Sequence, residues 1–115
     1  METVEVAEAV RGSDGAVLLD CLGTWVTAVL DRADGWNRPP AEWRGDFDAR
    51  LEDLVRAWHG HPGTAIAVTN EVGWGLVSEH RAGRIFTDLL GTVNQQLAAV
   101  CDDVFLLVAG RALRL

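Results

Sequence analysis

Three short apolar runs constrain the fold of this chain more than any other feature. They are AVLLD at 16–20, TAIAVTN at 64–70 and VFLLVA at 104–109, the last with a potential continuation after Gly110 to Leu115. The first lacks the polar–apolar alternation of a half-exposed strand, which is typical of a parallel strand covered on both faces. Stretches with helical periodicity separate the runs, so the sequence predicts an α/β domain with a parallel sheet and right-handed crossovers.

Apolar stripes with a period of three to four residues predict the helices. The stripe of the second helix begins at Leu22 and ends near Asp34, and the longest stripe extends from Glu79 to about Cys101 with Ser78 as its cap. A short helix from Val4 to Arg11 is expected after a Thr3 cap, and another begins at Asp46. The segment 35–45 is predicted to be a loop because Pro39 and Pro40 disfavour both helix and strand.

Composition narrows the class of protein and its partners. The 115 residues, with 49% hydrophobic and 23% charged, are those of one globular domain. A net charge of −7 argues against a nucleic-acid partner, and the apolar runs are too short to span a bilayer. The acidic N-terminus does not resemble a signal peptide, so we expect a cytoplasmic protein with Cys21 and Cys101 reduced.

The first apolar run ends in Asp20, as the Walker B strand of a nucleotide-binding protein does. Asp20, Asn70 and Gly110 are all expected at the carboxyl ends of strands, where α/β sheets bind ligands. However, no G-x-x-x-x-G-K-[ST] motif occurs, and all ten basic residues other than histidine are arginine. Either the Walker B interpretation is wrong or the chain is incomplete.

Two longer segments resemble one enzyme family. VLLDCLGTWVTAVL and TNEVGWGLVSEHRAGRIFTDLLGTVNQQLAAVCDDVFLLVAG resemble the bifunctional adenosylcobinamide kinase/adenosylcobinamide-phosphate guanylyltransferases of cobalamin biosynthesis. The E-T-V-E segment ending at Glu5 is similar to the end of that family's W-x-T-x-E motif, so the resemblance covers essentially all of residues 1–115. The family carries a P-loop and a guanylylated histidine ahead of this region. The resemblance therefore implies a shortened chain or a misplaced start codon, with the P-loop upstream of Met1.

The resemblance also implies a fold and a chemistry. The fold would be a three-layer P-loop NTPase-like (RecA-like) parallel sheet with flanking helices, of which residues 1–115 form the C-terminal two-thirds without the N-terminal strands and P-loop. The enzyme phosphorylates adenosylcobinamide with ATP or GTP and then transfers GMP from GTP through the histidine. The family's acidic nucleotide-binding positions match Glu5 and Asp20, and Asp20 would accept hydrogen bonds from guanine or bind Mg²⁺. Asn70 and Glu71 would border the corrin substrate.

Other residues have structural interpretations as well as functional ones. Asp20 could be a helix cap, and Glu5 a solvated residue of a first helical turn. His59 and His61 stand beside Pro62 and Gly63 with no third ligand, so we interpret them as loop residues, and His80 has no neighbouring nucleophile. Trp74, between Gly73 and Gly75, is either a core anchor or a cover for a flat ligand.

Two functional classes remain after the sequence analysis. The chain is a member of this transferase family with no catalytic residue of its own and no tightly bound nucleotide, or it is a standalone oligomerisation or binding module. Strands left without their neighbours would expose apolar surface, so we expect a homo-oligomer, as the family is trimeric.

Overall fold

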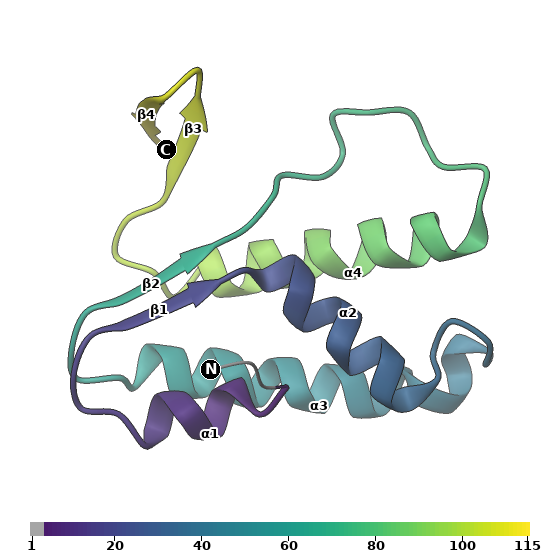
Figure 1. Cartoon of the computed structure of the whole chain (residues 1–115), viewed down its shortest axis with the longest axis horizontal. Helices are drawn as coiled ribbons and strands as arrows, with labels where there is room; N and C mark the ends of the chain where they lie inside the picture. Colours follow the sequence, from purple (N-terminus) through teal and green to yellow (C-terminus); the bar gives the residue numbers. More distant parts are fainter. Residues whose placement is uncertain (1–3) are drawn as a thin grey trace.

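The computed structural model describes residues 4–115 and has an α/β fold with a small parallel sheet and flanking helices (Figure 1). The predicted cap Thr3 lies outside the described residues. In chain order, the elements are α1 (Val6–Arg11), β1 (Val17–Asp20), α2 (Leu22–Ala33), α3 (Pro40–His59), β2 (Ala65–Val68), α4 (Arg81–Ala98), β3 (Phe105–Val108) and β4 (Arg111–Arg114). Among these helices, none has the length and hydropathy that crossing a bilayer requires.

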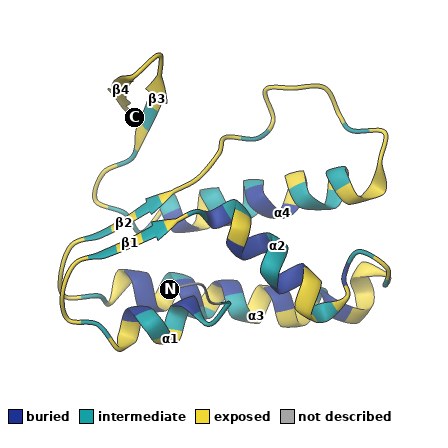
Figure 2. Ribbon diagram, viewed as in Figure 1, coloured by how far each residue is buried: buried dark blue, intermediate teal, exposed yellow. Residues whose placement is uncertain are grey.

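The parallel sheet consists of β1 and β2, paired from Val17↔Ala65 to Asp20↔Val68. The side chains at Val17, Leu19, Ala65 and Ala67 pack against the helical core, whereas Leu18 and Ile66 remain 69% and 55% exposed. The prediction that the first strand is covered on both faces is therefore wrong for this chain, because the helices cover only one face. Figure 2 shows this as alternating half-buried and exposed positions along both strands.

The hydrophobic core lies between the helices. Its aromatic centre is Phe47 of α3, whose ring centroid lies 5.8 Å from that of Trp25 on α2 and 6.4 Å from that of Trp43. Leu89, Leu90, Val93 and Leu97 of α4 complete it from the other side. All five apolar residues of the stripe predicted for the second helix, Leu22, Trp25, Val26, Val29 and Leu30, are buried as expected.

Helix α3 begins at Pro40, six residues before the start predicted at Asp46. The prediction of a loop over 35–45 is wrong in its second half. Proline is tolerated in the first turn of a helix, where its missing N–H would have no intrahelical acceptor. The early start also buries Trp43, one turn ahead of Phe47.

The third apolar run does not join the parallel sheet. β3 instead pairs with β4 in an antiparallel hairpin, from Phe105↔Arg114 to Val108↔Arg111. The two residues between the strands, Ala109 and Gly110, both have positive φ, at 50° and 74°. A two-residue turn of that kind matches the natural twist of a hairpin, so local geometry decides the pairing. The prediction of three strands in one parallel sheet is thereby corrected.

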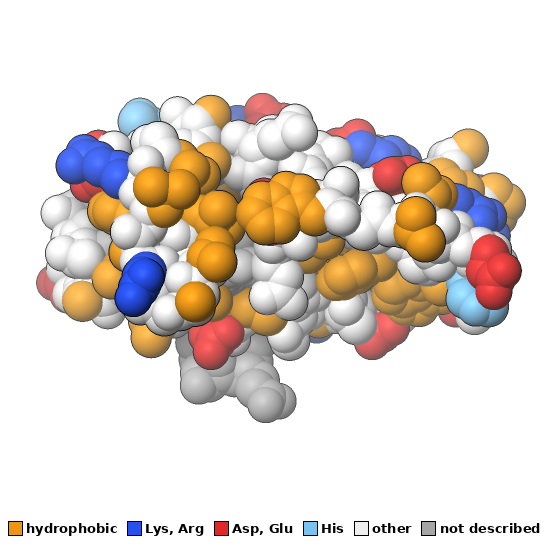
Figure 3. Space-filling view, turned by 90° about the horizontal axis from the view of Figure 1, so that it is seen from above, with side chains coloured by type: hydrophobic (Ala, Val, Ile, Leu, Met, Phe, Trp, Pro, Cys, Tyr) orange, Lys and Arg blue, Asp and Glu red, His pale blue; other side chains and the backbone are white. Residues whose placement is uncertain are grey.

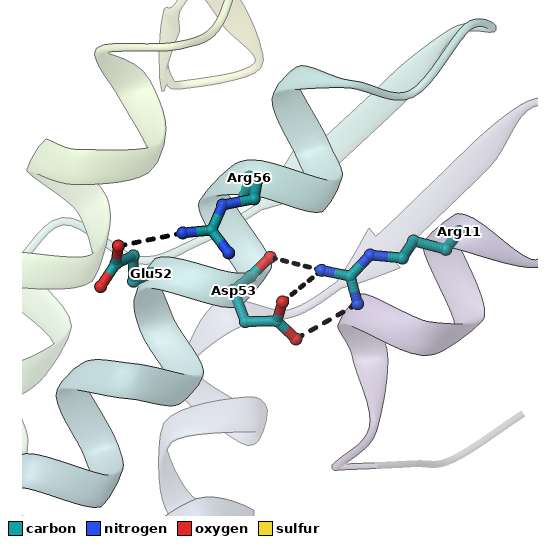
Figure 4. A network of polar contacts seen from close by, with 4 residues as sticks. All are labelled: Arg11, Glu52, Asp53 and Arg56. Atoms are coloured by element: carbon teal, nitrogen blue, oxygen red, sulfur yellow. Dashed lines mark hydrogen bonds and ion pairs between the residues drawn. The ribbon is translucent and has the colours of Figure 1, made fainter.

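Helix α1 is attached to α3 by both apolar and polar contacts. Val6 and Val10 are buried in the core. The Arg11 guanidinium donates to both carboxylate oxygens and to the backbone carbonyl of Asp53, beside the Arg56–Glu52 pair on the same helix (Figure 4). These contacts fix the segment that leads into β1.

Candidate functional site

The carboxyl ends of β1 and β2 meet at one edge of the parallel sheet. The register places Asp20 opposite Val68, and Thr69, Asn70 and Glu71 follow directly (Figure 1). Three of the four predicted site residues, Asp20, Asn70 and Glu71, therefore lie at the same edge. All three are exposed. This edge, comprising residues 20–21 and 69–71, is the candidate site.

Asp20 is the last residue of β1 and stands one position ahead of the cap of α2. The N-cap is Cys21, in extended conformation, and the peptide bond that joins it to Asp20 is cis. Within residues 4–115, the Asp20 carboxylate makes no hydrogen bond or ion pair, so it does not serve as the helix cap that a structural interpretation would assign. A free carboxylate at a strand end can accept hydrogen bonds from a ligand or bind a cation.

Cys21 is half-buried beside Asp20. Its Sγ lies 3.3 Å from Oγ1 of Thr24 in the first turn of α2. That hydrogen bond, with weaker contributions from the backbone N–H groups of Thr24 and Gly23, lowers the pKa of the Cys21 thiol. The predicted reduced state fits this arrangement, since both cysteines are free.

The loop after β2 is held by Asn94 of α4. The Thr69 hydroxyl donates to Asn94 Oδ1 at 2.6 Å, and Asn94 Nδ2 donates to the carbonyl of Asn70 at 3.0 Å. Asn94 is not among the predicted site residues. The signal in the sequence is an amide side chain directly after the apolar stripe residue Val93, within the family-like run 84–98.

The predicted substrate residues differ in what they contact. Glu71 accepts a hydrogen bond from the backbone N–H of Val72 at 3.0 Å, which leaves its second oxygen exposed. Asn70 is bound only through its carbonyl, and its side-chain amide makes no hydrogen bond within the described residues. Both side chains therefore have polar groups available to a ligand.

Glu5, the other predicted nucleotide-binding residue, lies at the opposite end of α2. Its carboxylate accepts hydrogen bonds from Arg32, at 2.6 Å, and from Arg50, at 3.3 Å. The Arg32 hydrogen bond above all, and then Arg50, hold the pKa of Glu5 below its usual range. Arg32 is in the last turn of α2 and Asp20 precedes its first turn, so the Glu5 carboxylate contacts the end of α2 that is remote from Asp20.

A cavity of about 490 Å³ adjoins Glu5, lined by Arg32, Arg50, Asp46, Trp43 and Phe47 among others. It lies between α2 and α3, away from the edge where β1 and β2 end. The structure thus brings Asp20, Asn70 and Glu71 together and leaves Glu5 in a separate, arginine-lined surface.

His59 and His61 lie where α3 ends and the loop to β2 begins. His59 is the last residue of α3. His61 Nε2 lies 2.8 Å from the carbonyl oxygen of Gly15, and this contact joins the loop ahead of β2 to the loop ahead of β1. In the part of the chain that is described, no three His, Cys, Asp or Glu side chains are grouped so as to hold a metal ion.

Comparison with known proteins identifies close relatives. The chain matches the family described as cobinamide kinase / cobinamide phosphate guanyltransferase over residues 1–115. It is 42% identical over 101 residues to the bifunctional adenosylcobalamin biosynthesis protein CobU of Salmonella typhimurium, covering 84% of this chain and 56% of that protein. The Escherichia coli CobU is 39% identical over 111 residues, covering 92% and 61%.

A third relative, the bifunctional adenosylcobalamin biosynthesis protein CobP of Pseudomonas aeruginosa, is 35% identical over 94 residues. That alignment covers 82% of this chain and 49% of the relative. The chain therefore spans about half to three-fifths of the length of the curated relatives it matches.

Proposed function

The chain belongs to the cobinamide kinase / cobinamide phosphate guanyltransferase family, and we propose that it forms part of a bifunctional enzyme of cobalamin biosynthesis. The complete enzyme phosphorylates the aminopropanol hydroxyl of adenosylcobinamide with ATP or GTP. It then transfers GMP from GTP to that phosphate, releasing pyrophosphate. The observation that carries this proposal is the free Asp20 carboxylate at the end of β1, beside the end of β2.

Asp20 is the nucleotide-binding residue in this proposal. Its carboxylate accepts hydrogen bonds from the N1 and N2 donors of guanine, or it binds the Mg²⁺ that accompanies the phosphates. The neighbouring oxygen donors, the Thr69 hydroxyl and the Asn70 amide, are of the hard type that Mg²⁺ prefers. When bound, Mg²⁺ neutralises charge on the transferring phosphoryl group. Asn70 and Glu71 border the cobinamide.

Glu5 is the second nucleotide-binding residue in this proposal. Because Arg32 and Arg50 already bind its carboxylate, a nucleotide at Glu5 would meet a mixed-charge surface rather than a free acceptor. We therefore assign the main nucleotide contact to Asp20. Glu5 ranks second, and its assignment rests on its match to the family's motif.

We further propose that residues 1–115 are the C-terminal two-thirds of a three-layer RecA-like domain. Support comes from the open face of the parallel sheet at Leu18 and Ile66, and from the outer edges of its two strands, which pair with no other strand among residues 4–115. Further strands and a covering helix layer would bury both. A net charge of −7 favours small-molecule substrates over nucleic acid, and we place the enzyme in the cytoplasm.

The 115 residues alone contain neither a P-loop motif nor any lysine. We therefore propose that this chain by itself catalyses neither step and binds no nucleotide tightly. The competing function is a standalone oligomerisation or binding module, which the open sheet face would also serve.

A chimeric protein distinguishes the proposed enzymatic function from the function of a standalone module. In the Salmonella typhimurium relative, the aligned 101 residues are replaced by those of this chain, and cobinamide-dependent consumption of ATP and labelling by GTP are measured. We expect the chimera to carry out both steps, and the 115-residue chain to carry out neither. A folded chimera without either activity would support the binding module instead.

A further inference from the structure

An exposed apolar segment projects from the carboxyl end of the sheet. Residues 73–77, here called the strap, are the middle of the connection between β2 and α4, on the outer side of the molecule (Figure 1). Their apolar side chains, Trp74, Leu76 and Val77, are 74%, 101% and 85% exposed. Trp74 is therefore not the core anchor that one interpretation of the sequence allowed.

Both ends of the strap are anchored, although its middle is open. On the β2 side, Val72 packs against the core and faces Gly91 of α4. On the α4 side, the hydroxyl of Ser78 accepts from the His80 N–H at 3.1 Å, and its carbonyl accepts from Arg84 at 3.0 Å. The fixed ends limit the conformations open to residues 73–77, so little ordering is needed when a ligand binds.

The space around the strap is open. A Cβ added at Gly73 or Gly75 would meet nothing within 4 Å, and Gly73 has a φ of 109° that favours glycine. Figure 3 views the molecule from the side on which the strap and the hairpin lie, and hydrophobic side chains are distributed across that face. The strap thus offers apolar contacts with room beside them.

The position and size of the strap favour a small flat ligand over a protein. The loop that contains it leaves the carboxyl end of β2 through Asn70, at the edge that also holds Asp20, and such edges bind ligands in α/β folds. The strap is only five residues long, whereas each partner contributes roughly 20–30 residues to a protein interface.

We propose that the strap is the surface that contacts the corrin ring of cobinamide, with Trp74 against the ring face and Leu76 and Val77 against its methyl-bearing rim. The inference rests on the proposed function, which names cobinamide as substrate. A corrin is broad and flat, and its apolar face and rim would be shielded from water by these side chains. Polar groups at Asn70 and Glu71 lie at the start of the same loop for the ring's amide substituents.

Equilibrium dialysis of the 115-residue chain against dicyanocobinamide tests the proposal, with bound corrinoid read from its visible absorption. The variant Trp74→Ala/Leu76→Ser should bind about tenfold or more weakly, as expected when central aromatic and aliphatic contacts are truncated. The matched control, Leu113→Ser, changes an exposed leucine on β4 and should bind as the wild type does. Circular dichroism checks that the variants fold.

Equal affinity of the strap variant and the wild type would overturn the proposal, as would the absence of corrinoid binding to the wild-type chain. A change of oligomeric state in the strap variant would identify the strap as a contact between copies and overturn it too. These outcomes are independent of the chimera experiment. An active chimera with strap-independent binding refutes the strap alone, whereas an inactive chimera refutes the proposed function even if the strap binds corrinoid.

Discussion

In the proposed function, Asp20 is the residue that contacts the nucleotide directly. It is exposed and makes no hydrogen bond within residues 4–115, so its replacement removes a ligand contact and little else. In the chimera with the Salmonella relative, Asp20→Asn should weaken nucleotide binding by about 10- to 100-fold, the loss expected for one hydrogen bond to a charged group. Calorimetric titration with GTP measures it. Asp14→Asn, in the exposed turn ahead of β1, is the control, and unchanged affinity in Asp20→Asn would exclude a role for Asp20.

The two cysteines should differ in reactivity. The hydrogen bond with Thr24 lowers the pKa of Cys21, whereas burial raises the pKa of Cys101. Because the thiolate is the reactive form, iodoacetamide at pH 8 should modify Cys21 before Cys101. Thr24→Val removes the hydrogen bond and should slow modification of Cys21 without affecting Cys101. Peptide mass spectrometry over time decides, and preferential labelling of Cys101 would contradict the assignment.

At the scale of elements, the apolar runs and stripes predicted the type and position of most helices and strands. β1, β2, α2 and the body of α4 lie within their predicted ranges, because strong apolar runs and stripes fix both type and position. The predicted start of α3 is wrong because Pro40 was interpreted as a helix breaker, whereas it occupies the first turn of the helix. The predicted pairing of β3 is wrong because an apolar run does not determine which strand lies beside it. Here the Ala109–Gly110 turn determines that β3 pairs with β4.

The candidate site was predictable to a similar degree. Asp20 and Asn70 share an edge because parallel strands end together, a consequence of topology that the sequence order already implied. The separation of Glu5 from Asp20, and the role of Asn94, depend on how α2 and α4 pack, and single-sequence patterns do not contain that geometry.

Two helical glycines should respond in opposite ways to alanine. A Cβ at Gly83 would lie 2.5 Å from Ser78 Oγ and 2.9 Å from Ser78 Cβ, whereas one at Gly45 meets nothing within 4 Å. Gly45→Ala should stabilise α3 by about 0.5–1 kcal/mol. Gly83→Ala should destabilise the protein by about 1 kcal/mol through overpacking against the end of the strap. Urea unfolding measures both, and a stabilising Gly83→Ala would show that Ser78 moves freely.

Helix α1 should detach first in acid. Its flanking carboxylates, Glu5 and Asp53, have pKa values lowered mainly by Arg32 and Arg11 respectively. A carboxylate with a lowered folded pKa contributes stability that is complete above its unfolded pKa, about 4.3 for Glu and 3.9 for Asp, and is lost as pH falls through the folded value. Hydrogen exchange at Val10 should therefore accelerate below about pH 4 relative to Leu90 in α4. Arg11→Gln removes the contribution of Asp53, so exchange at Val10 should be faster already at neutral pH and should depend less on acid. Coincident changes at both sites would contradict local detachment.

At the scale of the whole molecule, the chain is less compact than its length allows. The radius of gyration is 14.5 Å, against about 13 Å expected for a domain of this length. The β3–β4 hairpin and the strap project from the helical body (Figure 1), and both carry exposed apolar side chains. A further exposed apolar surface is the open face of the parallel sheet, where Leu18, Ile66 and Val68 are exposed.

That open face leads to the last prediction, that this chain forms homo-oligomers through it. Burying the face removes apolar surface from water at about 25 cal/mol per Å², and a second copy can also pair with the free strand edges, which no lysine protects. Light scattering at micromolar concentrations should give a mass above the 12.5 kDa of one chain. Leu18→Ser/Ile66→Thr should shift the distribution toward monomers, whereas Trp74→Ala should not, because the strap is assigned to a different ligand. A wild-type chain that stays monomeric would contradict the role of the sheet face. A mass distribution that changes only in Trp74→Ala would show that the strap, and not the sheet face, is the contact between copies.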